Sequence, residues 1–140
     1  MGRKLSLRGQ IPPNTRERVF FFDSNIQNKG WKIKEAKMQN PSVGRVEVAA
    51  VLHTTDITLS TAVLEWDRNT VIGCFECLSA IGNCNDLLDL DHVVVGNLYL
   101  SNVDTNYALN YWIVLEELTI SPSENIMYQL KEVAQNVDNP

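Results

Sequence analysis

The chain has 140 residues, of which 44% are hydrophobic and 21% are charged, so its size and composition are those of one globular domain. It contains no run of about 18 apolar residues, which excludes a predicted transmembrane helix. Its first residues also lack the apolar stretch of a secretory signal. We therefore expect a single domain over residues 1–140 and no membrane partner.

The net charge of −5 is distributed unevenly along the chain. Residues 1–45 hold ten Lys/Arg and three acidic residues, a net charge of +7, whereas residues 46–140 hold two and fourteen, a net charge of −12. Opposite charges in the two parts favour a surface that pairs with copies of itself or with partner proteins. The acidic majority opposes nucleic-acid binding, which we do not expect.

The N-terminal residues 1–16 predict a basic arm or edge strand, because Leu5 and Leu7 alternate with Lys4 and Arg8. Basic residues in and just after this segment are the predicted contacts to a partner: Arg3, Lys4, Arg8, Arg16 and Arg18.

Seven further segments carry the alternation or the β-branched and aromatic content of strands. They are residues 17–23, 31–38, 45–52, 57–63, 71–78, 88–100 and 107–120, whereas residues 82–86 have the composition of a loop. Within 31–38 the alternation changes phase near Glu35, which predicts a β-bulge. Residues 111–115 are continuously apolar, so we expect them to be buried on both faces of their sheet.

A single helix is predicted over residues 121–137. Ser121 and Glu124 have the spacing of a capping box, with Pro122 at the first helical position. Apolar residues follow at helical spacing, among them Ile126 and Leu130. The predicted fold is therefore mainly β: an antiparallel, jelly-roll-like β-sandwich of about eight strands over residues 17–120, with one C-terminal α-helix.

Catalytic signatures are missing from the sequence, so we predict that the protein is not an enzyme and needs no cofactor. It has two histidines, no Gly-x-Ser-x-Gly elbow and no glycine-rich phosphate loop. His53 follows an apolar strand, and we expect it on the surface at the strand end.

Candidate metal ligands are Cys74, Cys77, Cys84 and His92, whose side chains are of the types that zinc prefers. Residues three apart on a strand face opposite sides, however, so Cys74 and Cys77 should not converge on one ion. We predict no metal site. An odd number of cysteines also indicates reduced, buried thiols rather than a disulfide framework.

Aromatic residues leave a glycan open as a partner. A sugar-binding face on the sandwich could be lined by Trp31, Trp66, Trp112, Tyr99, Tyr107 and Tyr111. Core packing is the alternative use of the same side chains on alternating strands.

Four segments resemble small structural proteins of marine bacteriophages. They are residues 4–12, the aromatic strand 18–23, residues 91–101 and the pair Tyr111-Trp112. The resemblance covers most of the chain and implies a virion component, made in the host bacterial cytoplasm, whose partners are copies of itself and other virion proteins. The predicted function is thus a capsid-associated, cement or tail-attached structural protein, and the alternative is a carbohydrate-binding β-sandwich module for host attachment.

Overall fold

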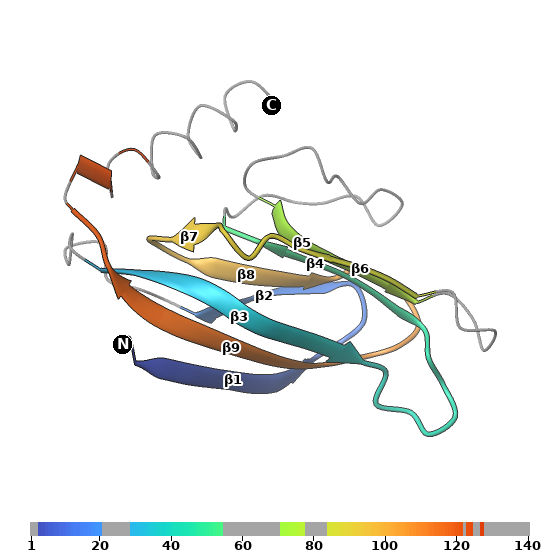
Figure 1. Ribbon diagram of the computed structural model, residues 1–140. Coiled ribbons are helices and arrows are strands. Elements are labelled where there is room, and N and C mark those ends of the chain that lie inside the picture. Colours follow the sequence, from blue (N-terminus) through green and yellow to red (C-terminus); the bar gives the residue numbers. More distant parts are fainter. Residues whose placement is uncertain are drawn as a thin grey trace, which may run out of the picture.

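The computed structural model describes residues 3–20, 29–54, 71–77, 84–121, 123, 124 and 127. In these residues the chain is mainly β (Figure 1). Nine strands are present in this part of the chain: β1 (Lys4–Ile11), β2 (Thr15–Phe20), β3 (Lys29–Gln39), β4 (Val48–His53), β5 (Val71–Cys77), β6 (Cys84–Leu88), β7 (Val93–Val94), β8 (Leu98–Asn102) and β9 (Leu109–Thr119).

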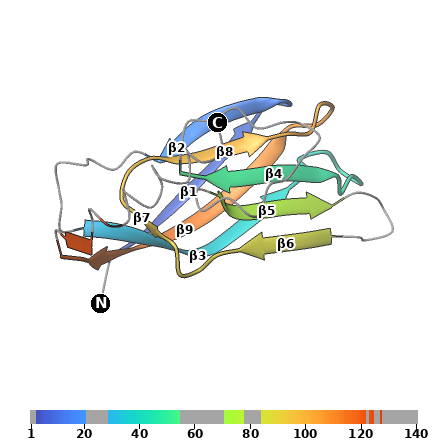
Figure 2. The same cartoon turned by 90° about the horizontal axis from the view of Figure 1, so that it is seen from above.

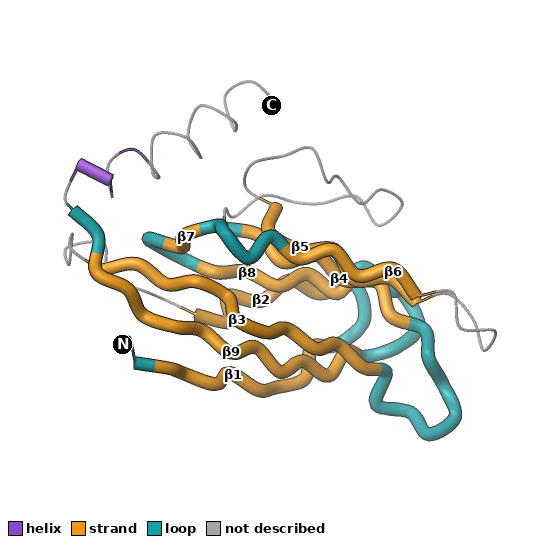
Figure 3. Tube along the Cα trace, viewed as in Figure 1, coloured by secondary structure: helices purple, strands orange, loops and turns teal. Residues whose placement is uncertain are grey.

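The strands form two antiparallel sheets. One sheet has four strands in the order β1-β9-β3-β7, and the other has five in the order β2-β8-β4-β5-β6. The two sheets are stacked face to face, and the strands of one run obliquely to those of the other (Figure 2). The connection between β3 and β4 projects from one end of the stack (Figure 3).

The core lies between the sheets and follows from alternation along the strands. On β9, Leu109, Ile113 and Leu115 are fully buried and point toward the five-stranded sheet. Leu52 and Leu100 meet them from the opposite layer and are equally buried. Each such side chain contributes about 1.5–3 kcal/mol when removed from water, so the period of two along β9 holds the layers together.

The predicted bulge is confirmed. The register between β3 and β9 shifts between Ile33 and Glu35. Before the shift Trp31 and Ile33 are buried, and after it Ala36 and Met38 pack against the same core. The extra residue therefore keeps apolar side chains on one face although the sequence changes phase.

Several predicted boundaries differ from the structure. The loop expected at 82–86 contributes to β6, because its backbone pairs with β5 although its side chains are polar. The single strand expected over 88–100 is divided into β7 and β8, which belong to different sheets. β4 begins at Val48, because the preceding residues belong to the projecting connection.

The capping box predicted for the C-terminal helix is present. The Ser121 Oγ accepts the Glu124 N–H at 3.1 Å, and the Ser121 N–H donates to Glu124 Oε1 at 3.3 Å. Ser123 and Glu124 have helical backbone geometry. Most of the predicted helix over 121–137 lies outside the described residues, as does the strand predicted over 57–63.

A buried asparagine joins the two sheets at one end of the sandwich. Asn102 is on β8, and its Nδ2 donates to the carbonyl oxygens of Ile11 at 3.3 Å, Pro12 at 3.1 Å and Tyr107 at 2.9 Å. Its Oδ1 accepts the Asp104 N–H at 3.2 Å. One amide thus satisfies backbone groups from the β1–β2 turn and from the β8–β9 connection.

Replacing this side chain should lower stability because buried backbone carbonyls would lose their donor. We expect Asn102→Ala to reduce the free energy of unfolding by about 2–3 kcal/mol, measured by urea denaturation. Asn106→Ala, in the same connection but exposed, should change it by less than about 0.5 kcal/mol. Equal effects of the two substitutions would contradict this role of Asn102.

Candidate functional site

The outer face of the four-stranded sheet carries polar, basic and aromatic side chains. Strand alternation and the pairing of β1, β9 and β3 place four rows of residues on it. From one end to the other these rows are Gln10–Asn110–Gln39, Arg8–Trp112–Lys37, Ser6–Val114–Glu35 and Lys4–Glu116–Lys32. These twelve residues are called the outer face below.

Trp112 is the large aromatic side chain of the outer face. It is 44% exposed, although the apolar run 111–115 predicted burial on both sides of the strand. The Arg8 guanidinium carbon lies 4.6 Å from the centroid of the Trp112 ring, a cation–π distance. On the other side, Lys37 is the register partner of Trp112 and lies 3.1 Å from Glu35. A partly exposed ring is therefore flanked by two cations.

An amide row lies next to this ring. The Gln10 Nε2 donates to the Asn110 Oδ1 at 2.9 Å, and Gln39 is the register partner of Asn110 on the other side. Each amide carries both donors and acceptors. The row can thus exchange hydrogen bonds with a ligand that also carries both.

The predicted partner-binding cations do not gather on one surface. Lys4 and Arg8 are on the outer face, and Arg3 forms an ion pair with Glu117 at 3.5 Å. Arg16 and Arg18 are on β2, opposite Ser101 and Tyr99 of the five-stranded sheet. These positions point away from the core on the opposite side of the sandwich. All five cations are exposed, but they lie on, or directly before, the end strands of two different sheets: Arg3, Lys4 and Arg8 at β1, and Arg16 and Arg18 on β2.

Acidic residues gather at the other end of the five-stranded sheet. Asp86 is on β6, and Asp89 and Asp91 are in the turn that follows, where the Asp91 N–H donates to Asp89 Oδ1 at 3.1 Å. All three are exposed. Leu87 and Leu90, at 46% and 53% exposure, lie among them. This end therefore combines negative charge with exposed apolar surface.

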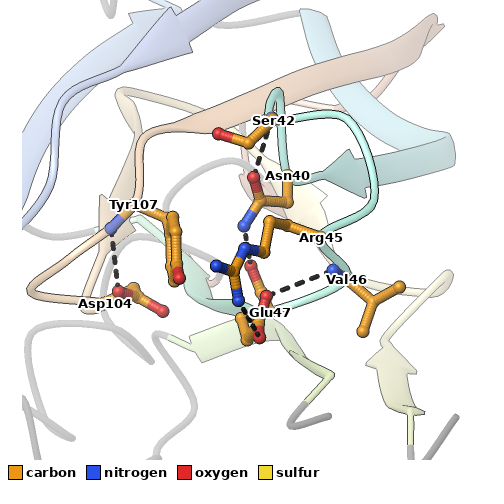
Figure 4. A network of polar contacts seen from close by, with 7 residues as sticks. All are labelled: Asn40, Ser42, Arg45, Val46, Glu47, Asp104 and Tyr107. Carbon is orange, nitrogen blue, oxygen red and sulfur yellow. Dashed lines mark hydrogen bonds and ion pairs between the residues drawn. The ribbon is translucent and has the colours of Figure 1, made fainter. Parts of the chain in front are cut away.

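A hollow of about 240 Å³ lies where the connection between β3 and β4 folds against β5 and β6. Asn40 shapes it: its Nδ2 donates to the Glu47 carbonyl at 3.0 Å, and its Oδ1 accepts the Ser42 N–H at 2.9 Å (Figure 4). Arg45 contacts Glu47 at 3.9 Å and lies over the Tyr107 ring at 5.6 Å. Because these polar groups already satisfy one another, the network explains the loop shape without a ligand.

His53 is buried, which corrects its predicted place on the surface. Its Nε2 lies 2.9 Å from the Ser101 Oγ, and its ring stacks on Tyr99 at 5.7 Å between centroids. Neighbours on the same side of this sheet, Val51 and Cys74, are buried as well. A Ser–His contact so enclosed has no access to a substrate, and the geometry gives it a packing role.

The other aromatic residues considered for a sugar-binding face have different surroundings. Trp31 is only 3% exposed and belongs to the core, and Trp66 lies outside the described residues. Tyr111 packs against the core from the inner side of β9. Burial raises the pKa of the Tyr111 phenol above its ordinary value, and the Glu17 carboxylate adds to the rise. The predicted aromatic face is thus reduced to Trp112 on the outer face.

The candidate metal ligands do not form a cluster in the described part of the chain, where no group of three metal-binding side chains is found. Cys74 is buried and is not part of a disulfide, whereas Cys77 is disulfide-bonded and packs against the core. The expectation of uniformly reduced cysteines is therefore wrong for Cys77. Cys84 lies opposite Cys77 in the register of β5 and β6, and His92 is half-buried beyond the following turn.

The cysteines can be counted chemically. An intramolecular disulfide at Cys77 requires a second cysteine, and Cys74 is not part of a disulfide, so alkylation in denaturant without reductant should label one of the three cysteines. All three should be labelled after reduction, as read by intact mass. The variant Cys74→Ser should show no label before reduction. Three labelled thiols without reductant would contradict the disulfide.

Comparison with known proteins gives no match: no family model fits the chain, and no curated protein or solved structure is significantly similar to it. Among the described residues, no helix has the length and apolar character needed to cross a membrane.

Proposed function

We propose that this protein is a structural component that works through contacts with copies of itself and with other proteins, as in a bacteriophage virion assembled in the bacterial cytoplasm. We assign it no catalytic activity and no cofactor. The observation that carries this proposal is the opposite charge of the two end strands of the five-stranded sheet.

One end of that sheet is basic and the other is acidic. β2 presents Arg16 and Arg18 with the single acidic residue Glu17 between them, a net charge of +1, and β6 with its following turn presents Asp86, Asp89 and Asp91. Charged end strands commonly prevent sheets from joining edge to edge, because equal charges repel. Here the charges are opposite, so the basic end of one copy attracts the acidic end of the next.

The strand directions define how such copies would meet. Every neighbouring pair from β2 to β6 is antiparallel, so β2 and β6, at the two ends of five strands, run in the same direction. Copies related by translation would therefore bring β6 beside β2 as parallel strands. Such a contact uses two different surfaces, and it builds rings or filaments rather than closed dimers.

The strand order supports a jelly-roll topology. The sheet β1-β9-β3-β7 faces β2-β8-β4-β5, the alternation of early and late strands that two Greek keys produce, with β6 added at one end. Jelly rolls occur in viral capsid proteins and in lectins, which are the two functions that the sequence suggested. The proposed single domain of residues 1–140 includes a helix over 121–137, which the capping box supports.

Association should depend on salt. By light scattering, we expect oligomers at low ionic strength that dissociate as salt is added, because the Debye length falls from about 30 Å at 0.01 M to about 10 Å at 0.1 M. The pair Arg16→Glu/Arg18→Glu should be monomeric, and so should Asp89→Lys/Asp91→Lys. Mixing the two charge-reversed proteins should restore association. Both ends of the sheet are acidic in the first variant and basic in the second, so the two proteins attract each other.

Lys34→Glu is the matched control, since it reverses an exposed cation on β3 of the four-stranded sheet, away from both end strands of the five-stranded sheet, and should leave association unchanged. The proposal fails if the unmodified protein stays monomeric at low salt and high concentration. It also fails if the two reversed proteins do not associate when mixed.

A further inference from the structure

The outer face of the four-stranded sheet is not used by the edge contacts proposed above. We propose that this face binds an acidic polysaccharide, with Trp112 as the stacking surface, Arg8 and Lys37 as the carboxylate contacts, and the amide row as the hydroxyl contacts.

The dimensions of the face suit an extended chain. Its four rows span three intervals of two residues, about 20 Å along strands that rise about 3.4 Å per residue. Its three strands span about 10 Å across, at about 4.8 Å between neighbours. A surface of this length fits several consecutive sugar units of a polymer better than one small molecule enclosed in a pocket.

Trp112 supplies apolar contact in the middle of the face. It stands out from a sheet whose other side is the protein core, and 44% of it is exposed. The Arg8 guanidinium at 4.6 Å from its ring holds the indole in place and keeps N–H donors beside it. A sugar ring has an apolar C–H face that can stack on the exposed part of the indole that Arg8 does not cover, while its carboxylate can accept paired hydrogen bonds from the guanidinium.

The amide row distinguishes a sugar from a simple anion. Gln10 and Asn110 are hydrogen-bonded at 2.9 Å, so their orientations are coupled, and Gln39 extends the row on β3. Hydroxyl groups both donate and accept hydrogen bonds, as amides do. Neighbouring hydroxyls on one sugar ring therefore match a row of neighbouring amides.

The charges of the face favour an acidic ligand. Its cations outnumber its carboxylates: Lys4, Arg8, Lys32 and Lys37 against Glu35 and Glu116. Single-stranded nucleic acid would also be attracted to these cations, but proteins normally bind it with several aromatic rings on which successive bases stack. Here Trp112 is the one aromatic ring among the twelve residues of the face.

Binding can be measured by calorimetry with polygalacturonate fragments as the probe. We expect saturable binding that weakens at least tenfold in Trp112→Ala, and several-fold in Arg8→Gln and in Lys37→Gln. The methyl-esterified fragments, which keep the hydroxyls but lose the carboxylates, should bind several-fold more weakly. Circular dichroism and thermal unfolding of each variant verify that the fold is kept.

Arg45→Gln is the matched control: it removes one exposed cation outside the outer face and should leave affinity unchanged. Absence of binding up to millimolar probe would overturn the inference, as would unchanged affinity in Trp112→Ala. Tighter binding of oligo-dT that depends on Trp112 would replace the polysaccharide by nucleic acid. The charge-reversed variants of β2 and β6 leave this face intact, so loss of self-association and loss of polysaccharide binding can be distinguished.

Discussion

The pairing of β9 between β1 and β3 is the constraint on which the rest of the molecule depends. Leu109, Ile113 and Leu115 on its inner side close the core against the five-stranded sheet. The alternate positions point outward, so the same pairing that builds the core also sets Trp112 between cations of the two neighbouring strands. A surface fixed by strand register on both sides needs little rearrangement to bind a ligand.

The parts of the fold that the sequence predicted are those that depend on alternation alone. The bulge at Glu35 was predictable because apolar residues must stay on the core side, and only an extra residue reconciles that with the change of phase. The capping box was predictable because its two hydrogen bonds are local. The length of β9 followed from its continuous β-forming residues.

The rest of the fold depends on which strands pair and on which sides of each sheet are covered. The spacing of residues along one strand does not encode either of these. β6 was missed because a strand at the end of a sheet can be specified by its backbone pairing with β5. Trp112 and His53 were assigned the wrong exposure for the same reason. The outer side of β9 is partly exposed, whereas the corresponding side of β4 is buried. The sequence predicted the basic residues that could contact a partner. Only the structure shows that these residues are divided between the two sheets.

The central claim is that copies meet through the opposite ends of one sheet. Hydrogen exchange read by mass spectrometry, at low salt and at two protein concentrations, tests it most directly. Association should slow exchange in both β2 and β6 at the higher concentration, because their outward backbone groups become paired, while β9 should not change. Slower exchange at only one of these two strands, or at neither, would contradict the claim.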